Sequence, residues 1–252
     1  MFTDFDKRMK AYEFLVDHEV PSALPMIIRV DGKSFHTWTR YFKKPVDSKI
    51  VTAFTETAYE IAKKIQKCAF VFLQSDEVSF IIRNDLFESS NPWLGNRIQK
   101  ISSVVASMFT AIFNEFAVTS FGDKYPGLAF FDARCYPISS HEILNYLIWR
   151  QRDCSRNAVT SFARYELGKK DIFKKNSEEL EKMLLERNVI VPVEAKRGLS
   201  IYPVLVSFQA VNKKTNEPVE AKRKKWHIEV PEEFSSNREK YTELIDRTFE
   251  EE

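Results

Sequence analysis

A chain of 252 residues, 44% hydrophobic and 29% charged, is long enough to form one large domain or two small ones around a core of its own. Its 38 basic and 36 acidic residues leave a formal net charge of only +2. This excludes a general electrostatic clamp for nucleic acid, so any site for a polyanion must be local. The six glycines do not form the Gly-rich phosphate loops or the nucleophile elbow of other enzyme classes.

Cysteine usage and the N-terminal sequence bear on the cellular compartment. Cys68, Cys135 and Cys154 stand far apart with no CxxC pair, which argues against a zinc knuckle and favours buried thiols in a reducing compartment. The first fifteen residues are charged and lack the apolar run of a signal peptide. The most apolar stretch, 104–118, is shorter than a membrane-spanning helix. We therefore expect a cytoplasmic protein without a membrane partner.

The first 131 residues alternate between strand-like and helical patterns. Short runs rich in β-branched and aromatic residues predict strands, and apolar residues three and four apart predict helices. The predicted elements are a strand over 26–30, a helix from Asp47 or Ser48 to about 65, strands over 69–73 and 78–82, a helix over 98–116 and a strand over 128–131. This β-α-β-β-α-β order is that of ferredoxin-like α+β folds with an antiparallel sheet.

The remainder of the chain is less regular. A helical pattern runs from Ser139 to about Glu166, and a charge-rich segment follows that is helical from Ser177. Beyond it, the stretch 201–208 is strand-like. We expect a catalytic domain over 1–166 that includes the long helices. The segment 167–252 is then a C-terminal extension that packs on this domain without folding independently.

Acidic residues stand at two strand ends that the predicted fold brings together. Asp31 ends the first strand, and Asp76 and Glu77 precede the third. These strands are antiparallel neighbours in such a sheet, so Asp31 and Asp76 reach the same edge. A divalent cation offsets the repulsion between crowded carboxylates, and oxygen ligands without suitably spaced His or Cys favour Mg²⁺. Two Mg²⁺ ions there would indicate nucleotidyl transfer, although either turn alone is usually structural.

Candidate phosphate-binding residues follow the first of these strand ends. Gly32 lets the backbone approach a ligand, and the N–H groups that follow, up to His36, form a candidate anion nest. Four basic side chains are candidates for binding a triphosphate: Lys33, Lys44, Arg97 and Lys100. Arg97 and Lys100 also lie near the N-terminus of a predicted helix, whose dipole favours anions. The alternative for these cations is ordinary solvation, and for His36 it is a structural hydrogen bond.

Two further basic segments are candidates for contacts with RNA. Arg150, Asp153 and Asn157 line one face of the predicted helix 139–166, and Arg156 adds basic character. The second segment comprises the lysines at 213–214 and the basic run 222–225. The alternatives are a solvated helix face and a solvated loop.

Six short motifs, in this order, resemble those of the tRNA-histidine guanylyltransferase superfamily over about residues 9–164. They are Ile28–His36 (IRVDGKSFH), Phe42–Pro45 (FKKP), Gln74–Glu77 (QSDE), Lys100–Ser107 (KISSVVAS), Phe131–Arg134 (FDAR) and Trp149–Asp153 (WRQRD). Their number and order make the resemblance specific, whereas a lone DG or SDE would not.

The resemblance implies a palm-like catalytic domain that adds nucleotides to the 5′ end of tRNA in the 3′-5′ direction. In that family a 5′-monophosphate is first adenylylated with ATP. The 3′-hydroxyl of an incoming GTP or other nucleoside triphosphate then attacks the activated 5′ phosphate. The resemblance also implies a homotetramer.

The same resemblance assigns roles by position. Asp31, Asp76 and the Gly32 carbonyl match the ligands of two Mg²⁺ ions, and Glu77 matches an acidic residue needed for activity. The residues that match contacts to the nucleotide, its triphosphate or the activated 5′ end are Gly32, Lys33, Ser34, Phe35, His36, Lys44, Ser75, Arg97 and Lys100.

One motif departs from the guanylyltransferases proper. They carry a His-Ile-Asn-Asn string after the Asp-Cys pair that matches Asp153-Cys154, whereas this chain has Ser155-Arg-Asn157-Ala. The departure resembles the guanylyltransferase-like branch, whose members repair 5′-truncated tRNAs in a template-dependent way. We therefore expect templated 5′-end repair rather than addition of a single G to tRNA-His, with Asn157 as a contact to RNA or nucleotide.

Two other functions share this order of elements. A palm-like domain with metal carboxylates also serves nucleotide cyclases, which would form a cyclic product from ATP or GTP alone. RNA-recognition motif domains share the order too, but the stretch 73–82 lacks the exposed aromatic run that they use to stack bases. RNA binding that survives removal of divalent cations, without nucleotide addition, would favour the latter.

Overall fold

A six-stranded antiparallel sheet organises the computed structural model, which describes residues 3–86, 91–211 and 217–247. The strands are β1 (Met26–Gly32), β2 (Cys68–Gln74), β3 (Glu77–Ile82), β4 (Phe131–Pro137), β5 (Leu199–Val211) and β6 (Pro218–Glu229). Their order across the sheet is β4-β1-β3-β2-β5-β6. The expected β-α-β-β-α-β unit is confirmed, because the first four strands are interleaved with two helices, α3 and α4.

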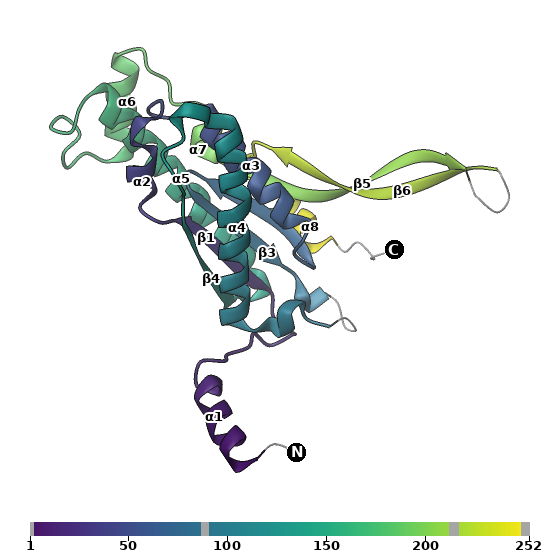
Figure 1. The fold of residues 1–252 in the computed structure, drawn as a ribbon. Helices are drawn as coiled ribbons and strands as arrows, with labels where there is room; N and C mark the ends of the chain where they lie inside the picture. Colours follow the sequence, from purple (N-terminus) through teal and green to yellow (C-terminus); the bar gives the residue numbers. More distant parts are fainter. Residues whose placement is uncertain (1–2, 87–90, 212–216, 248–252) are drawn as a thin grey trace.

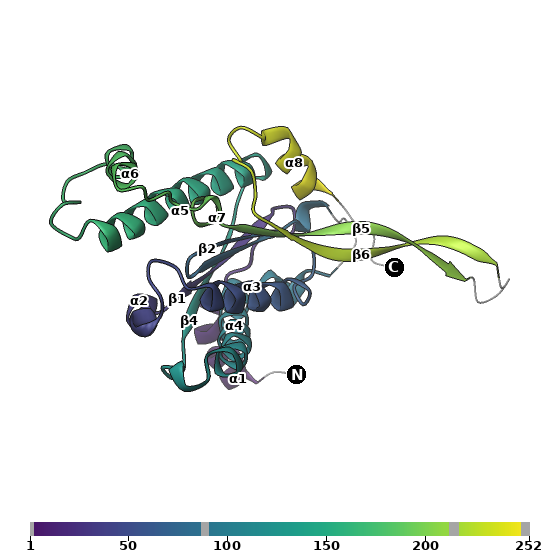
Figure 2. The same cartoon turned by 90° about the horizontal axis from the view of Figure 1, so that it is seen from above.

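Helices cover both faces of this sheet (Figures 1 and 2). α3 and α4 lie on one face, and α5 and α8 lie on the other. The α-helices are α1 (Asp4–Phe14), α2 (Phe35–Trp38), α3 (Ser48–Ala62), α4 (Ile98–Phe121), α5 (Ile143–Glu166), α6 (Ser177–Glu186), α7 (Val193–Arg197) and α8 (Arg238–Asp246). Because both faces are covered, all seven residues of β2 are buried, which explains its unbroken apolar sequence.

Two element boundaries differ from the sequence pattern. The sequence pattern predicts the fourth strand over 128–131, whereas β4 spans Phe131–Pro137. Leu128 and Phe130 are 62% and 53% exposed, so the apolar run precedes the strand. β4 itself is an edge strand with a polar outer face, which gives a weak hydrophobic signal. The helix expected from Ser139 starts at Ile143, after a short 3₁₀ turn over Ser140–Glu142.

α4 is longer than its apolar stretch indicated. It runs for 24 residues, and by length and composition it would suffice to cross a membrane. One face of α4, however, packs into the core that it shares with α3 and the sheet. Ile101, Val105, Phe109, Phe113 and Ala117 repeat at helical spacing and are fully buried. Core packing thereby accounts for the apolar character of this helix.

The C-terminal part of the chain extends the same sheet. β5 pairs with β2 through Val71 opposite Ile201, so the strand predicted around 201–208 is confirmed and is longer than expected. β5 and β6 form a hairpin that projects far beyond the body (Figure 1). At its start, a Cβ on Gly198 would lie 2.3 Å from the Leu73 carbonyl oxygen, so only glycine allows this approach. The division of the chain at residue 166 stays our prediction.

The three cysteines are buried thiols within this fold. Burial raises the pKa of Cys68, Cys135 and Cys154 to about 12 in each case. At neutral pH these thiols are therefore protonated and poor nucleophiles.

Candidate active site

The end of β1 and the turn between β2 and β3 meet at one edge of the sheet. Asp31 lies opposite Glu77 in the antiparallel β1–β3 register. The Gly32 N–H donates a 3.1 Å hydrogen bond to the backbone carbonyl of Asp76. Ser75 adopts a left-handed φ of 51° in this turn, which lets the chain reverse between β2 and β3. Asp31 and Asp76 thus lie at the same edge, as the sequence predicts.

β4 brings a fourth acidic residue to this edge. Asp132 lies opposite Asp31 in the β1–β4 register, and directly opposed residues project to the same face of a sheet. Asp31 therefore has acidic neighbours on both adjacent strands. We call Asp31, Asp76, Glu77 and Asp132 the carboxylate cluster. Sequence reasoning missed Asp132, because the expected strand ended one residue before it; its place in the FDAR motif was the available signal.

Burial and neighbouring charges raise the pKa of Asp31 above its ordinary value. Partial burial is the largest cause, and the charges of Asp76, Asp132 and Glu77 follow; Arg29 acts in the opposite direction. Ionised Asp31 is therefore unfavourable in the protein alone. A cation at this edge would relieve that penalty, since an opposite charge within a few ångströms favours the ionised form.

The donor atoms suit a hard divalent cation with few protein ligands. Asp31 and Asp76 are partly exposed, and within the described residues neither carboxylate has a hydrogen-bonding or ion-pairing side chain. No group of three His, Cys, Asp or Glu side chains is arranged to hold a metal in the described part of the chain. The predicted set, two carboxylates with the Gly32 carbonyl, stays a prediction. Mg²⁺ is commonly held in this way, with water and substrate phosphates as its other ligands.

The raised pKa of Asp31 predicts a pH-dependent stability. Without divalent cations, we expect Asp31→Asn to melt at a higher temperature than the wild type at pH 7, and the difference to shrink toward pH 4. The folded protein binds more protons than the unfolded chain between the ordinary pKa of about 3.9 and the raised one, so its stability falls as pH rises through that window. Asparagine does not ionise. Thermal unfolding in EDTA across this range tests it; a difference independent of pH would contradict it.

Glu77 is held by cations and is not a free carboxylate. Arg150 donates two hydrogen bonds to it, at 2.7 and 2.9 Å. The Gln74 side-chain amide donates a third at 3.0 Å, and the Arg29 guanidinium lies 3.9 Å away. These contacts tie α5 to the turn that carries Asp76. Glu77 therefore fixes the position of that turn, while its part in the reaction stays a prediction.

The four residues predicted to contact RNA lie together on α5. Asp153 accepts hydrogen bonds from Arg150 at 2.9 Å and from Asn157 at 3.3 Å, and it forms an ion pair with Arg156. Arg150 corrects the sequence interpretation. Its side chain is 7% exposed and is used by Glu77 and Asp153, so it is not available to RNA. Arg156 and Asn157 are exposed and keep the predicted role as candidates.

The loop after β1 packs more tightly than an open phosphate loop. A Cβ on Gly32 would lie 2.9 Å from the side chain of Phe35, so glycine is needed for the loop to fold onto itself. The Phe35 ring is buried and stacks on Trp38 at 5.0 Å; it belongs to the core and offers a ligand only its backbone. The Lys33 N–H is bonded to the Phe130 carbonyl at 2.9 Å and takes no part in the expected anion nest. Exposed side chains of the predicted nucleotide site are Lys33, Ser34, His36, Lys44 and Ser75.

The structure separates Arg97 and Lys100 from the carboxylate cluster. α4 begins where β3 ends, at the opposite end of the sheet from Asp31, about 20 Å away by the length of a seven-residue strand. Arg97 forms an ion pair with Asp17 at 2.7 Å there. Within one chain, Arg97 and Lys100 therefore do not reach a triphosphate held beside Asp31. Their contact with a triphosphate or with the activated 5′ end elsewhere stays a prediction.

Comparisons with known proteins agree with this architecture. The family model of tRNAHis guanylyltransferase matches residues 6–139, which include the whole carboxylate cluster. A probable tRNA(His) guanylyltransferase of Dictyostelium discoideum is 32% identical over 239 residues, which cover 84% of this chain and 89% of that protein.

Solved structures extend the likeness over nearly the whole chain. A bacterial tRNA(His) guanylyltransferase (Thg1)-like protein in complex with ATP is 32% identical, with a TM-score of 0.83 and coverage of 96% of this chain and 99% of that one. A bacterial Thg1-like protein in complex with GTP has a TM-score of 0.78, with the same identity and coverage. The chain belongs to the tRNA(His) guanylyltransferase family.

Proposed function

We propose that this protein is a Mg²⁺-dependent nucleotidyltransferase that adds nucleotides to the 5′ end of tRNA in the 3′-5′ direction and repairs truncated 5′ ends on a template. The observation that carries the proposal is the convergence of Asp31 and Asp76 at one edge of a palm-like sheet. ATP and GTP occupy the related Thg1-like structures, which supports nucleoside triphosphates as substrates here.

Asp31, Asp76 and the Gly32 carbonyl would hold two Mg²⁺ ions. When bound, these ions would supply Lewis-acid stabilisation of the attacking oxygen and of the leaving group. The leaving group is pyrophosphate when ATP adenylylates the 5′-monophosphate, and AMP when the 3′-hydroxyl of the incoming nucleotide attacks the adenylylated end. The side chains of Asp31 and Asp76 fix where that charge stabilisation acts. The 3.1 Å hydrogen bond from the Gly32 N–H to the Asp76 carbonyl joins the two backbone segments. It thereby fixes the positions of the two carboxylates relative to each other.

The exposed residues of the segment that follows β1 are suited to bind and orient the triphosphate. Lys33 and Lys44 bring point charges from the loop that follows β1, and Ser34 and His36 bring polar groups. The Lys44 ammonium donates to the Thr39 hydroxyl at 3.2 Å, which holds it in the loop. On α5, Arg156 and Asn157 contact Asp153, and their exposure supports a role in RNA binding.

An extension assay tests the reaction and its specificity. A labelled tRNA lacking its first 5′ nucleotide is incubated with Mg²⁺, ATP and each nucleoside triphosphate separately. We expect extension only by the nucleotide that pairs with the opposing base on the 3′ side. Addition of G regardless of that base would instead indicate guanylylation of tRNA-His and make the interpretation of Ser155 wrong. No addition by a folded protein would refute the proposal, and a cyclic nucleotide formed without RNA would identify a cyclase.

We also propose a homotetramer in the cytoplasm. Exposed apolar side chains on α1 and just after it support self-association: Phe5, Tyr12, Phe14, Leu15 and Val16 are each at least 55% exposed. Light scattering should then give four times the 29.5 kDa of one chain; a monomeric mass would refute the tetramer.

A further inference from the structure

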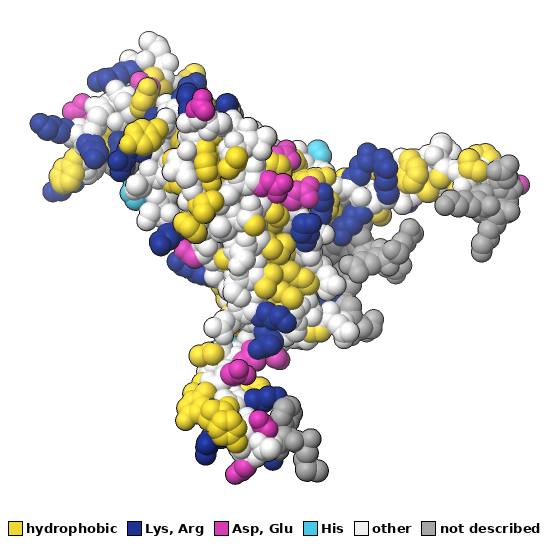
Figure 3. Space-filling model, in the orientation of Figure 1, with side chains coloured by type: hydrophobic (Ala, Val, Ile, Leu, Met, Phe, Trp, Pro, Cys, Tyr) yellow, Lys and Arg dark blue, Asp and Glu magenta, His cyan; other side chains and the backbone are white. Residues whose placement is uncertain are grey.

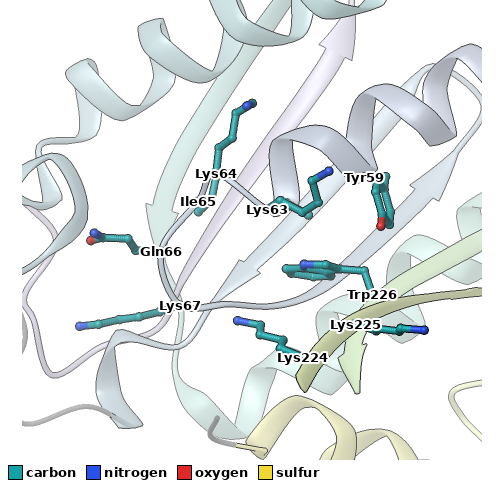
Figure 4. Close-up of a pocket in the computed structure, with 10 residues that line it drawn as sticks. Tyr59, Lys63, Lys64, Ile65, Gln66, Lys67, Lys224, Lys225 and Trp226 are labelled. Atoms are coloured by element: carbon teal, nitrogen blue, oxygen red, sulfur yellow. The ribbon is translucent and has the colours of Figure 1, made fainter. Parts of the chain in front are cut away.

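A basic pocket lies where the β5–β6 hairpin joins the body. It has a volume of about 400 Å³ and opens between the end of α3, the loop that follows it and β6 (Figure 4). Its walls consist of Tyr59, Ala62, Lys63, Lys64, Ile65, Gln66, Lys67, Lys224, Lys225 and Trp226. Lysines from two segments about 160 residues apart in sequence therefore surround one hollow.

Positive charge dominates the lining. Five of the ten lining residues are lysines and none is acidic. Lys63 is partly neutralised by Glu60, at 2.6 Å, and lies 4.7 Å from the centre of the Tyr59 ring. The Lys224 ammonium lies 5.5 Å from the centre of the Trp226 ring. Figure 4 shows the Trp226 indole between Lys63 and Lys224, with Tyr59 beside it. Aromatic surface thus separates the charges in the pocket.

The pocket is remote from the carboxylate cluster. The loop that carries Lys64 and Lys67 precedes β2, whereas Asp76 follows it, so the two sites are about 20 Å apart along a seven-residue strand. The pocket lies on the α3 side of the sheet, while Asp31 is on the same face as Glu77, which binds α5. Positive charge extends from the pocket along the hairpin. Lys222 and Lys224 are two residues apart in β6, so their side chains project to the same face of the strand. Lys and Arg side chains gather along the inner half of the hairpin in Figure 3.

We propose that this pocket and the adjoining face of β6 bind the phosphodiester backbone of the RNA substrate, at phosphates far from the reacting 5′ end. The inference rests on the proposed function, because that function identifies the polyanion as RNA. With a net charge of only +2 on the whole chain, a concentration of lysines in one hollow is a local polyanion site. The lysines are spread around the pocket and along the strand, which fits successive phosphates of a chain better than a single triphosphate.

RNA affinity and its salt dependence test the site without reference to catalysis. The variant Lys64→Gln/Lys224→Gln removes one charge from each wall of the pocket. The matched control, Lys7→Gln/Lys182→Gln, removes two exposed lysines from α1 and α6. Binding of tRNA without nucleotide is measured by filter retention between 50 and 300 mM KCl. We expect the pocket variant to bind about tenfold more weakly at 150 mM KCl, with a log–log salt slope smaller by about 1.4–1.8.

The results of this binding experiment distinguish the proposed RNA-binding site from the proposed nucleotide addition. Equal affinities and salt slopes for the pocket and control variants would overturn the proposal. At saturating tRNA we expect the pocket variant to add nucleotides at the wild-type rate, because neither lysine is near the cluster; a loss of that maximal rate with unchanged affinity would also overturn it. If the wild type binds tRNA through the pocket but adds no nucleotide, the proposed function fails and the binding site stands.

Chemical protection distinguishes RNA from free nucleotide. Acetylation of surface lysines is followed by mass spectrometry with tRNA, with ATP or with neither. We expect tRNA, and not ATP, to protect Lys64 and Lys224, while Lys7 reacts equally in all three samples. Protection of the pocket lysines by ATP alone would assign the pocket to a nucleotide and overturn the proposal for RNA.

Discussion

Asp76→Ala is expected to lower the rate of nucleotide addition by about a thousandfold or more while the protein stays folded. Loss of one carboxylate ligand removes charge stabilisation of several kcal/mol from the transition state, and each 1.36 kcal/mol corresponds to about a factor of ten. The fold should tolerate the change, because the Asp76 side chain is partly exposed. The bond that fixes the turn uses the Asp76 backbone carbonyl, which alanine retains.

Single-turnover extension of the truncated tRNA measures this effect, and thermal unfolding checks the fold. Asp171→Ala, which removes an exposed carboxylate between α5 and α6, is the matched control and should keep wild-type activity. Mg²⁺ should raise the melting temperature of the wild type and of the control but much less that of Asp76→Ala, because ligand binding stabilises only a protein that holds the ligand. Near-wild-type addition by Asp76→Ala would make the metal assignment wrong.

Arg150→Met is expected to destabilise the fold by about 3–5 kcal/mol, because it removes the cation that pairs directly with the largely buried Glu77 carboxylate and leaves only the more distant Arg29. Arg150 is 7% exposed and binds Glu77 with two hydrogen bonds and Asp153 with one. Methionine fills a similar volume but supplies no charge. For a chain of this length we expect a drop in melting temperature of about 6–20 °C, at about 2–4 °C per kcal/mol.

A control on the same helix isolates the effect of burial. Arg156 also pairs with Asp153 but is 66% exposed, so Arg156→Met should change stability by less than about 1 kcal/mol. Adding Glu77→Gln to Arg150→Met should restore part of the stability, since the charge at Glu77 that lost its direct partner is then gone. Denaturant unfolding of the four proteins gives these values. Equal effects of the two arginine substitutions would contradict the role assigned to Arg150.

The convergence of the metal carboxylates could be predicted because it depends on local order. A β-α-β-β-α-β sequence makes the first and third strands neighbours, and the antiparallel direction places the end of one beside the start of the other. Asp31 and Asp76 follow from that geometry. The position of Arg97 follows from it as well, since a helix that comes after β3 must begin at the far end of the sheet. The family motif alone does not contain this information.

The environment of α5 could not be predicted in the same way. Helical spacing places Arg150 and Asn157 on one face, but periodicity does not show which polar residues on that face are covered. Arg150 is buried by Glu77, a residue 73 positions away in the chain. Asn157 lies two helical turns after Arg150, outside the contact with Glu77, and is exposed.

The family, the order of the central elements and the pair of carboxylates at the ends of neighbouring strands could be predicted from the sequence, because they depend on motifs and on patterns within a few residues. Three features became visible only in the three-dimensional fold. β5 pairs with β2 across about 130 residues, Asp132 joins the carboxylate cluster, and lysines from the α3–β2 loop and from β6 line one pocket. Such contacts are selected by the packing of distant segments against each other. No local preference of either segment encodes them.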